Sequence, residues 1–160
     1  MSKGVERATG HDLGTVFETD GARLWRAVFA YTQSREITDD AVAEAFAQCL
    51  RRGDVVDDPR AWVWTAAFRI AGGELRDRSR SDQLPELPVD QPLDDDPERL
   101  LRALRTLPAN QRAVLVLRGY AGCRTEEIAE MLGIGRATVR VHLSRGRRRL
   151  RQLLDEEGRE

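Results

Sequence analysis

The chain has 160 residues, enough for one domain or two small ones, and 41% of them are hydrophobic and 33% charged, as in soluble proteins rich in surface helix. Cys49, Cys123, His11 and His142 are too far apart for a zinc site or a disulfide framework, and no apolar run has the length of a signal peptide or a membrane span. These features exclude secreted and membrane classes, and we expect a reduced, cytoplasmic protein without metal, cofactor or membrane contact.

The near-neutral total charge hides an uneven distribution. Residues 1–76 carry 10 basic and 12 acidic side chains, and residues 77–97 carry 2 basic and 7 acidic ones, a net charge of −5. Residues 98–160 carry 14 basic and 8 acidic side chains, a net charge of +6. A basic module that follows an acidic connector indicates a polyanionic partner for the last part of the chain.

Three helices are predicted in the first half of the chain, after a loose tail that ends at about Gly10. Apolar residues recur at helical spacing from Leu13 to Tyr31, with Phe17 among them, and again from Ala41 to Leu50. Ser34–Thr38 is predicted as a connector.

The caps and breaks in this half follow from single residues. Thr38 or Asp39 can cap the second helix. The acidic break Gly53–Pro59 precedes a third helix from about Arg60 to Arg78, with Ala61 among its buried candidates.

An extended linker is predicted next. Residues 77–97 contain four prolines and the run Asp94–Asp96, which oppose helix formation and compaction. Helical periodicity returns at Leu100–Leu107, and Pro108 begins another helix that ends near Gly119. No stretch of useful length alternates with period two, so the predicted fold class is all-α.

Residues 125–140 fit a helix-turn-helix. Thr125 can cap the first helix, Gly133 suits the positive-φ position that ends it, and Ile134 can fill the space between the two helices. The second helix is predicted from about Arg136 to Leu154.

Seven arginines and no acidic residue lie along the predicted second helix. A solvated helix face usually mixes both signs, whereas arginine forks bind phosphates or guanine edges and a helix fits the major groove. Binding of nucleic acid is therefore favoured over a merely solvated face. The arginines are Arg136, Arg140, Arg145, Arg147, Arg148, Arg149 and Arg151.

The order of these segments is similar to that of a known family. Residues 104–118, which begin Leu-Arg-Thr-Leu-Pro, lead into Ile128-Ala129 and then into residues 138–147, and together they resemble region four of the extracytoplasmic-function sigma factors. Upstream, residues 38–46 resemble the core-binding helix of sigma region two, and residues 59–64 resemble its promoter-melting helix. The resemblance covers about Leu13 to Leu154.

The resemblance implies a fold and a function. It implies two small all-α helical domains, the region-two bundle and the region-four helix-turn-helix, joined by a flexible linker. The implied boundaries are 1–10 for the tail, 11–78 for region two, 79–97 for the linker and 98–155 for region four. It also implies a specificity subunit of RNA polymerase without catalytic residues, which directs promoter-specific transcription initiation. The implied partners are the clamp and flap of core RNA polymerase, promoter DNA and an anti-sigma factor.

Site residues also follow from the resemblance, position by position. The upstream promoter element is expected to contact Arg136, Thr138, Arg140, Val141, Ser144, Arg145 and Arg148. The downstream element is expected to contact Arg60, Trp62, Arg69 and Arg76. Core polymerase is expected to contact Asp39, Asp40, Val42 and Phe46.

Several of these positions leave alternatives open. Trp62 and Trp64 cannot share one helix face, so one is expected in the core and the other at the DNA, without a choice between them. Asp39 can simply cap a helix, and Phe46 can be core. The chain also departs from the family where Gly135 replaces a common serine cap and Val141 a serine that often faces DNA.

Two other functions remain in competition. A stand-alone helix-turn-helix regulator would bind an operator without polymerase, and it would usually need a dimerisation surface, for which the sequence shows no additional helix. An enzyme in the first module would need a nucleophile–base pair, a metal spacing or a Gly-rich phosphate loop, and the first module contains none of these patterns.

Overall fold

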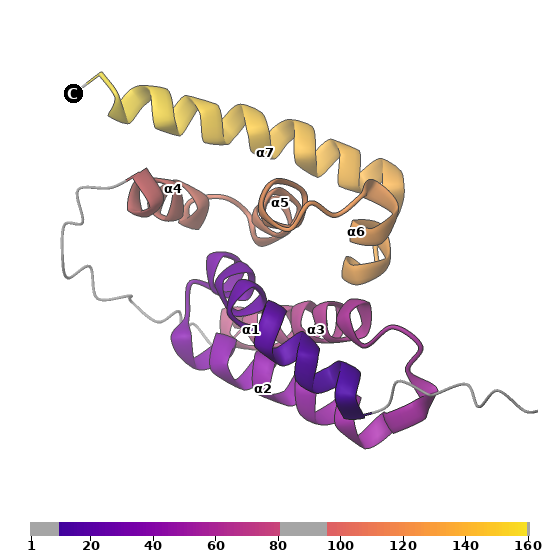
Figure 1. The fold of residues 1–160 in the computed structure, drawn as a ribbon. Coiled ribbons are helices and arrows are strands. Elements are labelled where there is room, and N and C mark those ends of the chain that lie inside the picture. The colour runs from indigo at the N-terminus through magenta and orange to yellow at the C-terminus, as the bar shows by residue number, and fades with distance from the viewer. Residues whose placement is uncertain (1–9, 81–95, 160) are drawn as a thin grey trace, which may run out of the picture.

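The computed structural model describes residues 10–80 and 96–159, and the first of these segments forms a three-helix bundle (Figure 1). Its elements are α1 (Gly10–Thr32), α2 (Arg35–Arg52), a 3₁₀ turn η1 (Gly53–Val55) and α3 (Pro59–Arg80). Pro59 is the first residue of α3, one residue before the predicted start, because a proline there loses no helical hydrogen bond. The predicted tail and most of the predicted linker lie outside the described residues.

The second segment is also helical. Its elements are α4 (Asp96–Arg105), α5 (Ala109–Leu115), a π-helical turn η2 (Val116–Tyr120), α6 (Thr125–Leu132) and α7 (Arg136–Glu157). Every regular element in the two described segments is a helix, which confirms the all-α prediction. None of the described helices is both long and apolar enough to cross a membrane.

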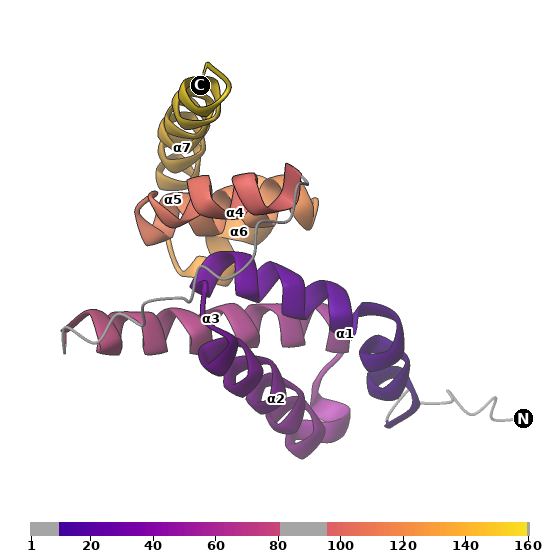
Figure 2. The same cartoon turned by 90° about the vertical axis from the view of Figure 1, so that its left-hand side faces the viewer.

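The helices form layers. The bundle of α1, α2 and α3 lies on one side, α4, α5 and α6 form the middle, and α7 runs along the outside (Figures 1 and 2). α7 packs on α4, α5 and α6, while α1 and α3 contact the middle layer from the opposite side. The two segments therefore form one continuous body, with α7 on the surface farthest from the first bundle.

Two predicted caps are wrong. The Ser34 hydroxyl accepts a hydrogen bond from the Ile37 amide and caps α2, whereas Thr38 lies buried inside that helix, where its hydroxyl donates to the Ser34 carbonyl. The connector is correspondingly shorter than predicted. In the helix-turn-helix, Arg124 is the N-cap residue and Thr125 is already helical, and no side chain caps this end of α6.

One predicted buried position is also wrong, and one residue of the predicted apolar pattern is exposed. Phe17 is 62% exposed, because α1 buries the face that carries Leu24 and Val28. Ala61 lies in the first turn of α3, exposed to a cleft.

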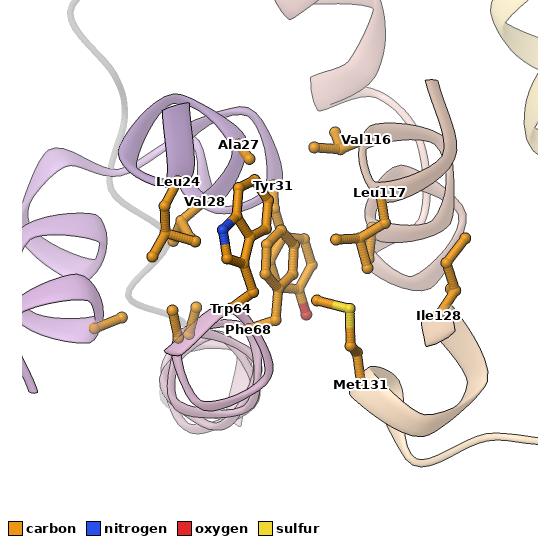
Figure 3. Packing of buried hydrophobic residues seen from close by; sticks show 14 of the residues in the cluster. Leu24, Ala27, Val28, Tyr31, Trp64, Phe68, Val116, Leu117, Ile128 and Met131 are labelled. Carbon is orange, nitrogen blue, oxygen red and sulfur yellow. The ribbon is translucent and has the colours of Figure 1, made fainter. Parts of the chain in front are cut away.

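One hydrophobic core runs through both bundles. Tyr31 stacks on Phe68, with 5.4 Å between ring centroids, and Trp64 also stacks on Phe68, with 6.4 Å between centroids. Figure 3 shows these rings between the aliphatic side chains of α1 and the side chains of Leu117 and Met131. The aromatic cluster of the first bundle thus also packs against η2 and α6.

Candidate nucleic-acid interface

The turn between α6 and α7 has the predicted geometry. Gly133 has φ 66° and ψ 34°, the left-handed conformation that a glycine adopts without a Cβ clash. The Ile134 amide donates to the Ala129 carbonyl at 3.0 Å, and Val139 is fully buried on the inner side of α7. These contacts fix the angle at which α7 leaves α6.

A close approach to α5 holds the middle of α7. Gly146 is buried, and a Cβ at this position would lie 3.0 Å from Leu115 Cδ1. A side chain here would crowd Leu115, because the two helices touch at this point. The recognition helix is therefore held both at its start and near its centre.

The arginines of α7 are exposed and mostly unpaired. Arg136 approaches Glu126 at 4.0 Å, but no ion pair reaches the other six within the described part of the chain. Thr138, Ser144 and Val141 are exposed on the same helix, and Val141 exposes 44% of its surface. Because the buried residues occupy the opposite face, every predicted upstream-element residue is accessible. An unpaired, solvated arginine keeps all its donors free for phosphate or base acceptors.

Four of these arginines and Ser144 border a shallow hollow of about 480 Å³ along α7. The spacing of its lining residues places them on one face of the helix. They are Arg140, Leu143, Ser144, Arg147, Arg148 and Arg151.

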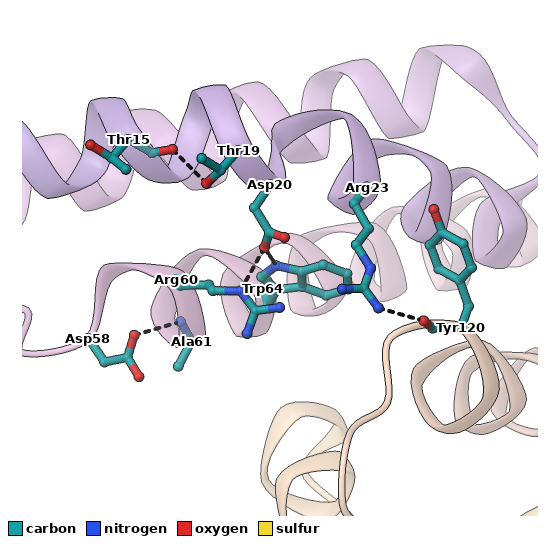
Figure 4. Close-up of polar contacts among 9 residues, drawn as sticks. All are labelled: Thr15, Thr19, Asp20, Arg23, Asp58, Arg60, Ala61, Trp64 and Tyr120. Carbon is teal, nitrogen blue, oxygen red and sulfur yellow. Dashed lines mark hydrogen bonds and ion pairs between the residues drawn. The ribbon is translucent and has the colours of Figure 1, made fainter.

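The tryptophans of α3 have different environments. Trp64 is 5% exposed, and its Nε1 donates to Asp20 Oδ2 at 2.5 Å. Arg60 Nε donates to the same oxygen at 3.0 Å, and its guanidinium lies 5.8 Å from the Trp64 ring centroid (Figure 4). Trp62 is half-buried, with the Arg52 guanidinium 5.6 Å from its ring centroid. Trp64 is thus the core tryptophan, and Trp62 is the accessible one.

The other predicted downstream-element residues are exposed on α3. Arg69 Nη2 donates to the Glu130 carbonyl of α6 at 3.4 Å. Arg76 is close enough to Tyr31 to lower the pKa of that phenol, although burial, the largest effect, raises it. Arg60, Trp62 and Arg69 line a common cleft, while Arg76 lies outside it.

This cleft separates α3 from α6 and has a volume of about 730 Å³. Its α6 side carries Glu127, Glu130 and Met131. A hydrogen bond from Arg124 is the largest cause that lowers the pKa of Glu127, and the charge of Arg60 across the cleft contributes least. The Arg60 guanidinium of one bundle therefore acts on the Glu127 carboxylate of the other.

The predicted polymerase-binding residues lie along α2. Asp39, Val42 and Phe46 share one helix face, and Asp39 Oδ1 accepts from Trp25 Nε1 at 2.7 Å. Asp40 is exposed, Val42 is buried, and Phe46 is half-buried with its ring edge-on to Phe17 at 5.3 Å.

Sequence reasoning missed the residues that connect the bundles. Arg112 is buried, its Nε donates to the Tyr31 carbonyl at 2.5 Å, and its Nη1 donates to the Leu107 carbonyl at 3.1 Å. Arg23 Nη2 donates to the Tyr120 carbonyl at 2.8 Å, and Arg26 Nε donates to the Tyr120 hydroxyl at 3.1 Å. No local sequence pattern predicts these contacts, because the two partners of each lie far apart in the chain.

Comparisons with known proteins identify the family. Residues 98–150 match the family described as "Sigma-70, region 4". The ECF RNA polymerase sigma factor SigL of Mycobacterium tuberculosis is 30% identical over 97% of this chain and 96% of its own length. The chain belongs to the extracytoplasmic-function sigma factors. It is accordingly a non-catalytic specificity subunit of RNA polymerase, as the sequence predicted, and the alternatives of a stand-alone regulator and an enzyme are not supported.

Further relatives agree with this family. The RNA polymerase sigma-E factor of Streptomyces coelicolor is 33% identical over 84% of this sigma factor and 72% of its own length. Among solved structures, the sigma factor RpoE of Bartonella quintana in complex with the anti-sigma factor NepR has a TM-score of 0.78, with 22% identity over 90% of this chain and 97% of RpoE. CnrH in complex with the cytosolic domain of CnrY has a TM-score of 0.68, with 23% identity over 91% and 89% of the two chains. These structures share the fold.

Proposed function

We propose that the two bundles divide promoter recognition, with residues 11–78 acting as region two and residues 98–155 as region four. Region four holds the upstream element as duplex DNA through α7. Region two holds polymerase through α2 and the separated strands of the downstream element through α3. The observation that carries the proposal is the row of six arginines on α7 without an ion-pair partner in the described segments.

The chemistry of α7 supports contact with duplex DNA. Arg140, Ser144 and Arg145 occupy its exposed arc and have the donors to reach bases or nearby phosphates. Arg136 and Thr138, at the helix start, are suited to the backbone, and Arg148 to a phosphate in the same groove. Val141 offers only apolar contact, for example with a thymine methyl.

The chemistry of α3 supports contact with unpaired bases. Melted DNA exposes base faces that proteins capture by stacking, and Trp62 is the accessible tryptophan of this helix. Arg60 and Arg69 line the same cleft as Trp62 and supply positive charge for the phosphates, and Arg76 lies further along the helix, outside the cleft. We therefore propose Trp62, rather than Trp64, as the stacking residue.

The exposed stripe of α2 supports a protein interface. Phe46, Phe17 and Leu50 form an apolar patch beside Asp39 and Asp40, and Leu50 is 66% exposed. An accessible apolar patch with an acidic rim is typical of a protein-binding surface. We assign this surface to the polymerase clamp and part of region four to the flap, in the cytoplasm where polymerase works. An anti-sigma factor is a further proposed partner, supported by the complexes of RpoE and CnrH.

Transcription in vitro tests this division. The chain is added to core RNA polymerase on a library of genomic promoter fragments, and we expect a defined set of transcripts that core alone does not produce. A gel shift of the isolated chain on the same fragments is the comparison. Tight, sequence-specific binding without polymerase, together with no stimulated transcript, would contradict the proposal.

A further inference from the structure

We infer that Trp25 of α1 is a positioning residue for polymerase binding, which holds the carboxylate of Asp39 in place and keeps the guanidinium of Arg35 away from it. The inference rests on the proposed role of α2 as the polymerase-binding helix, and it deepens that role. It makes α1 part of the binding surface, because one side chain of α1 sets the geometry and the charge of an acidic contact on α2.

Asp39 does not cap α2. Ser34 fills that position and accepts a hydrogen bond from the Ile37 amide, whereas Asp39 lies one turn into the helix. Asp39 is exposed, and among the described residues its side chain has one hydrogen-bond partner, Trp25 of α1, whose Nε1 donates to Oδ1 at 2.7 Å. The charge of Asp39 is therefore available to a partner outside the chain.

Arg35 is placed where it could neutralise this charge. It precedes Asp39 by one helical turn, the spacing at which arginine and aspartate side chains of one helix can pair. Within the two described segments no ion pair joins them. The Arg35 guanidinium instead lies over the Trp25 ring, 5.9 Å from its centroid. Trp25 thus contacts the acid through its N–H and the base through its ring, and this arrangement keeps the two charges apart.

The Trp25 ring is itself held in a fixed orientation. It is half-buried and stacks on Phe29, one turn further along α1, with 5.2 Å between ring centroids and 10° between ring planes. Because the ring is held, the direction of its N–H is fixed, and so is the position of the Asp39 carboxylate. A side chain that is ordered before its partner arrives loses less conformational entropy on binding.

The held carboxylate fits one kind of partner. It shares a face of α2 with Phe46, whose ring contacts Phe17 in the apolar patch assigned to polymerase. An acid beside an apolar patch suits a basic side chain at the edge of an apolar protein surface. An ion pair between Arg35 and Asp39 would cancel the charge that this partner needs. Trp25 therefore preserves the electrostatic part of the proposed contact.

Four variants of the full-length chain test the inference. Trp25→Phe removes the N–H and retains an aromatic ring. Trp25→Phe/Arg35→Gln also removes the cation that the released carboxylate would meet. The matched control Trp25→Phe/Arg51→Gln removes the same charge near the other end of α2, where Arg51 pairs with Glu44. Asp39→Asn removes the charge and retains a carbonyl acceptor. Fluorescence anisotropy of the labelled chain, titrated with core RNA polymerase in the absence of DNA, measures the Kd.

We expect Trp25→Phe to weaken polymerase binding about fivefold, a factor typical of the loss of one hydrogen bond. Adding Arg35→Gln should restore most of the lost affinity, and adding Arg51→Gln should restore none of it. A purely structural role of Trp25 predicts equal binding by the two double variants, because both carry the same substitution at position 25.

A spectroscopic measurement on the free chain does not depend on substituting Trp25. In a proton–nitrogen correlation spectrum, Asp39→Ala should shift the indole N–H signal of Trp25, because that N–H loses its acceptor. The indole signals of Trp62 and Trp64 should stay in place.

Wild-type affinity of Trp25→Phe, equal affinities of the two double variants, or an unmoved indole signal would each overturn the inference. Asp39→Asn separates this failure from failure of the proposed function. If Asp39→Asn binds polymerase as tightly as wild type, the polymerase role of Asp39 is wrong and the inference is wrong with it. If Asp39→Asn weakens binding and Trp25→Phe does not, the role of Asp39 stands and that of Trp25 is wrong.

Discussion

α3 and α7 are both 22-residue helices rich in arginine, and they present those arginines in different ways. On α7 the side chains extend into solvent with few partners, whereas on α3 Arg60 is bound to Asp20 and Arg69 to a carbonyl of α6. Under the proposed roles, α7 would bind intact duplex, which is present before melting. The α3 helix would bind separated strands, which exist only after melting, and its Arg60 and Arg69 contact the protein until then.

The largest effect is expected from substitution of two exposed arginines on α7. Arg140→Ala/Arg145→Ala should lower promoter-specific transcription about a hundredfold, because each base or phosphate contact contributes about 1–3 kcal/mol. Run-off transcription measures the loss, and co-purification should show unchanged binding to core polymerase. Arg159→Ala, beyond the end of α7, is the matched control. Normal transcription by the double variant would show that the recognition surface lies elsewhere.

On the α3 side, Asp20→Ala should destabilise the first bundle by about 1–3 kcal/mol, since the buried Trp64 N–H loses its acceptor. Urea unfolding followed by tryptophan fluorescence measures this effect. Asp20→Asn retains a carbonyl acceptor and should lose less. Equal midpoints for wild type and the alanine variant would rule out a structural role for this hydrogen bond.

Gly146→Val tests the close packing of α7 against Leu115 of α5. The added side chain would collide with Leu115, and overpacking of this kind should cost about 1–2 kcal/mol in thermal unfolding. Gly146→Ala should cost less, because the gain in helix propensity of about 1 kcal/mol offsets part of the crowding. If valine is tolerated without a change in melting temperature, α5 does not set the position of α7.

The smallest expected effect is a gain in stability on α3. No atom lies within 4 Å of a Cβ built at Gly73, so Gly73→Ala should stabilise the chain by about 0.5–1 kcal/mol. The neighbouring Gly72→Ala should gain less, because its Cβ would lie 3.1 Å from the Tyr31 hydroxyl. Calorimetry measures both variants. A lower melting temperature for Gly73→Ala would indicate crowding that the structure does not contain.

Local patterns predicted the helices and the exposed arginines of α7, because periodicity and the glycine turn depend on neighbouring residues. Which tryptophan of α3 is buried could not be predicted, since the choice depends on Asp20, 44 residues before Trp64. Ser34 and Thr38 both carry a hydroxyl that could cap a helix. Because α1 ends at Thr32 and α2 begins at Arg35, Ser34 is the residue at the cap position.

The contacts between the two bundles could not be predicted from the sequence either. An arginine is normally read as a surface residue, but Arg112 is buried because its acceptor comes from position 31, in another bundle.

One carboxylate oxygen of Asp20 accepts hydrogen bonds from two donors, of which one is buried and the other exposed. Trp64 is buried, while Arg60 approaches the same oxygen from solvent. If Arg60 binds a phosphate, as proposed, its guanidinium can leave Asp20 while the Trp64 indole keeps its acceptor and stays in place. The proposed binding of a DNA strand at the surface would therefore leave the packing around Trp64 unchanged.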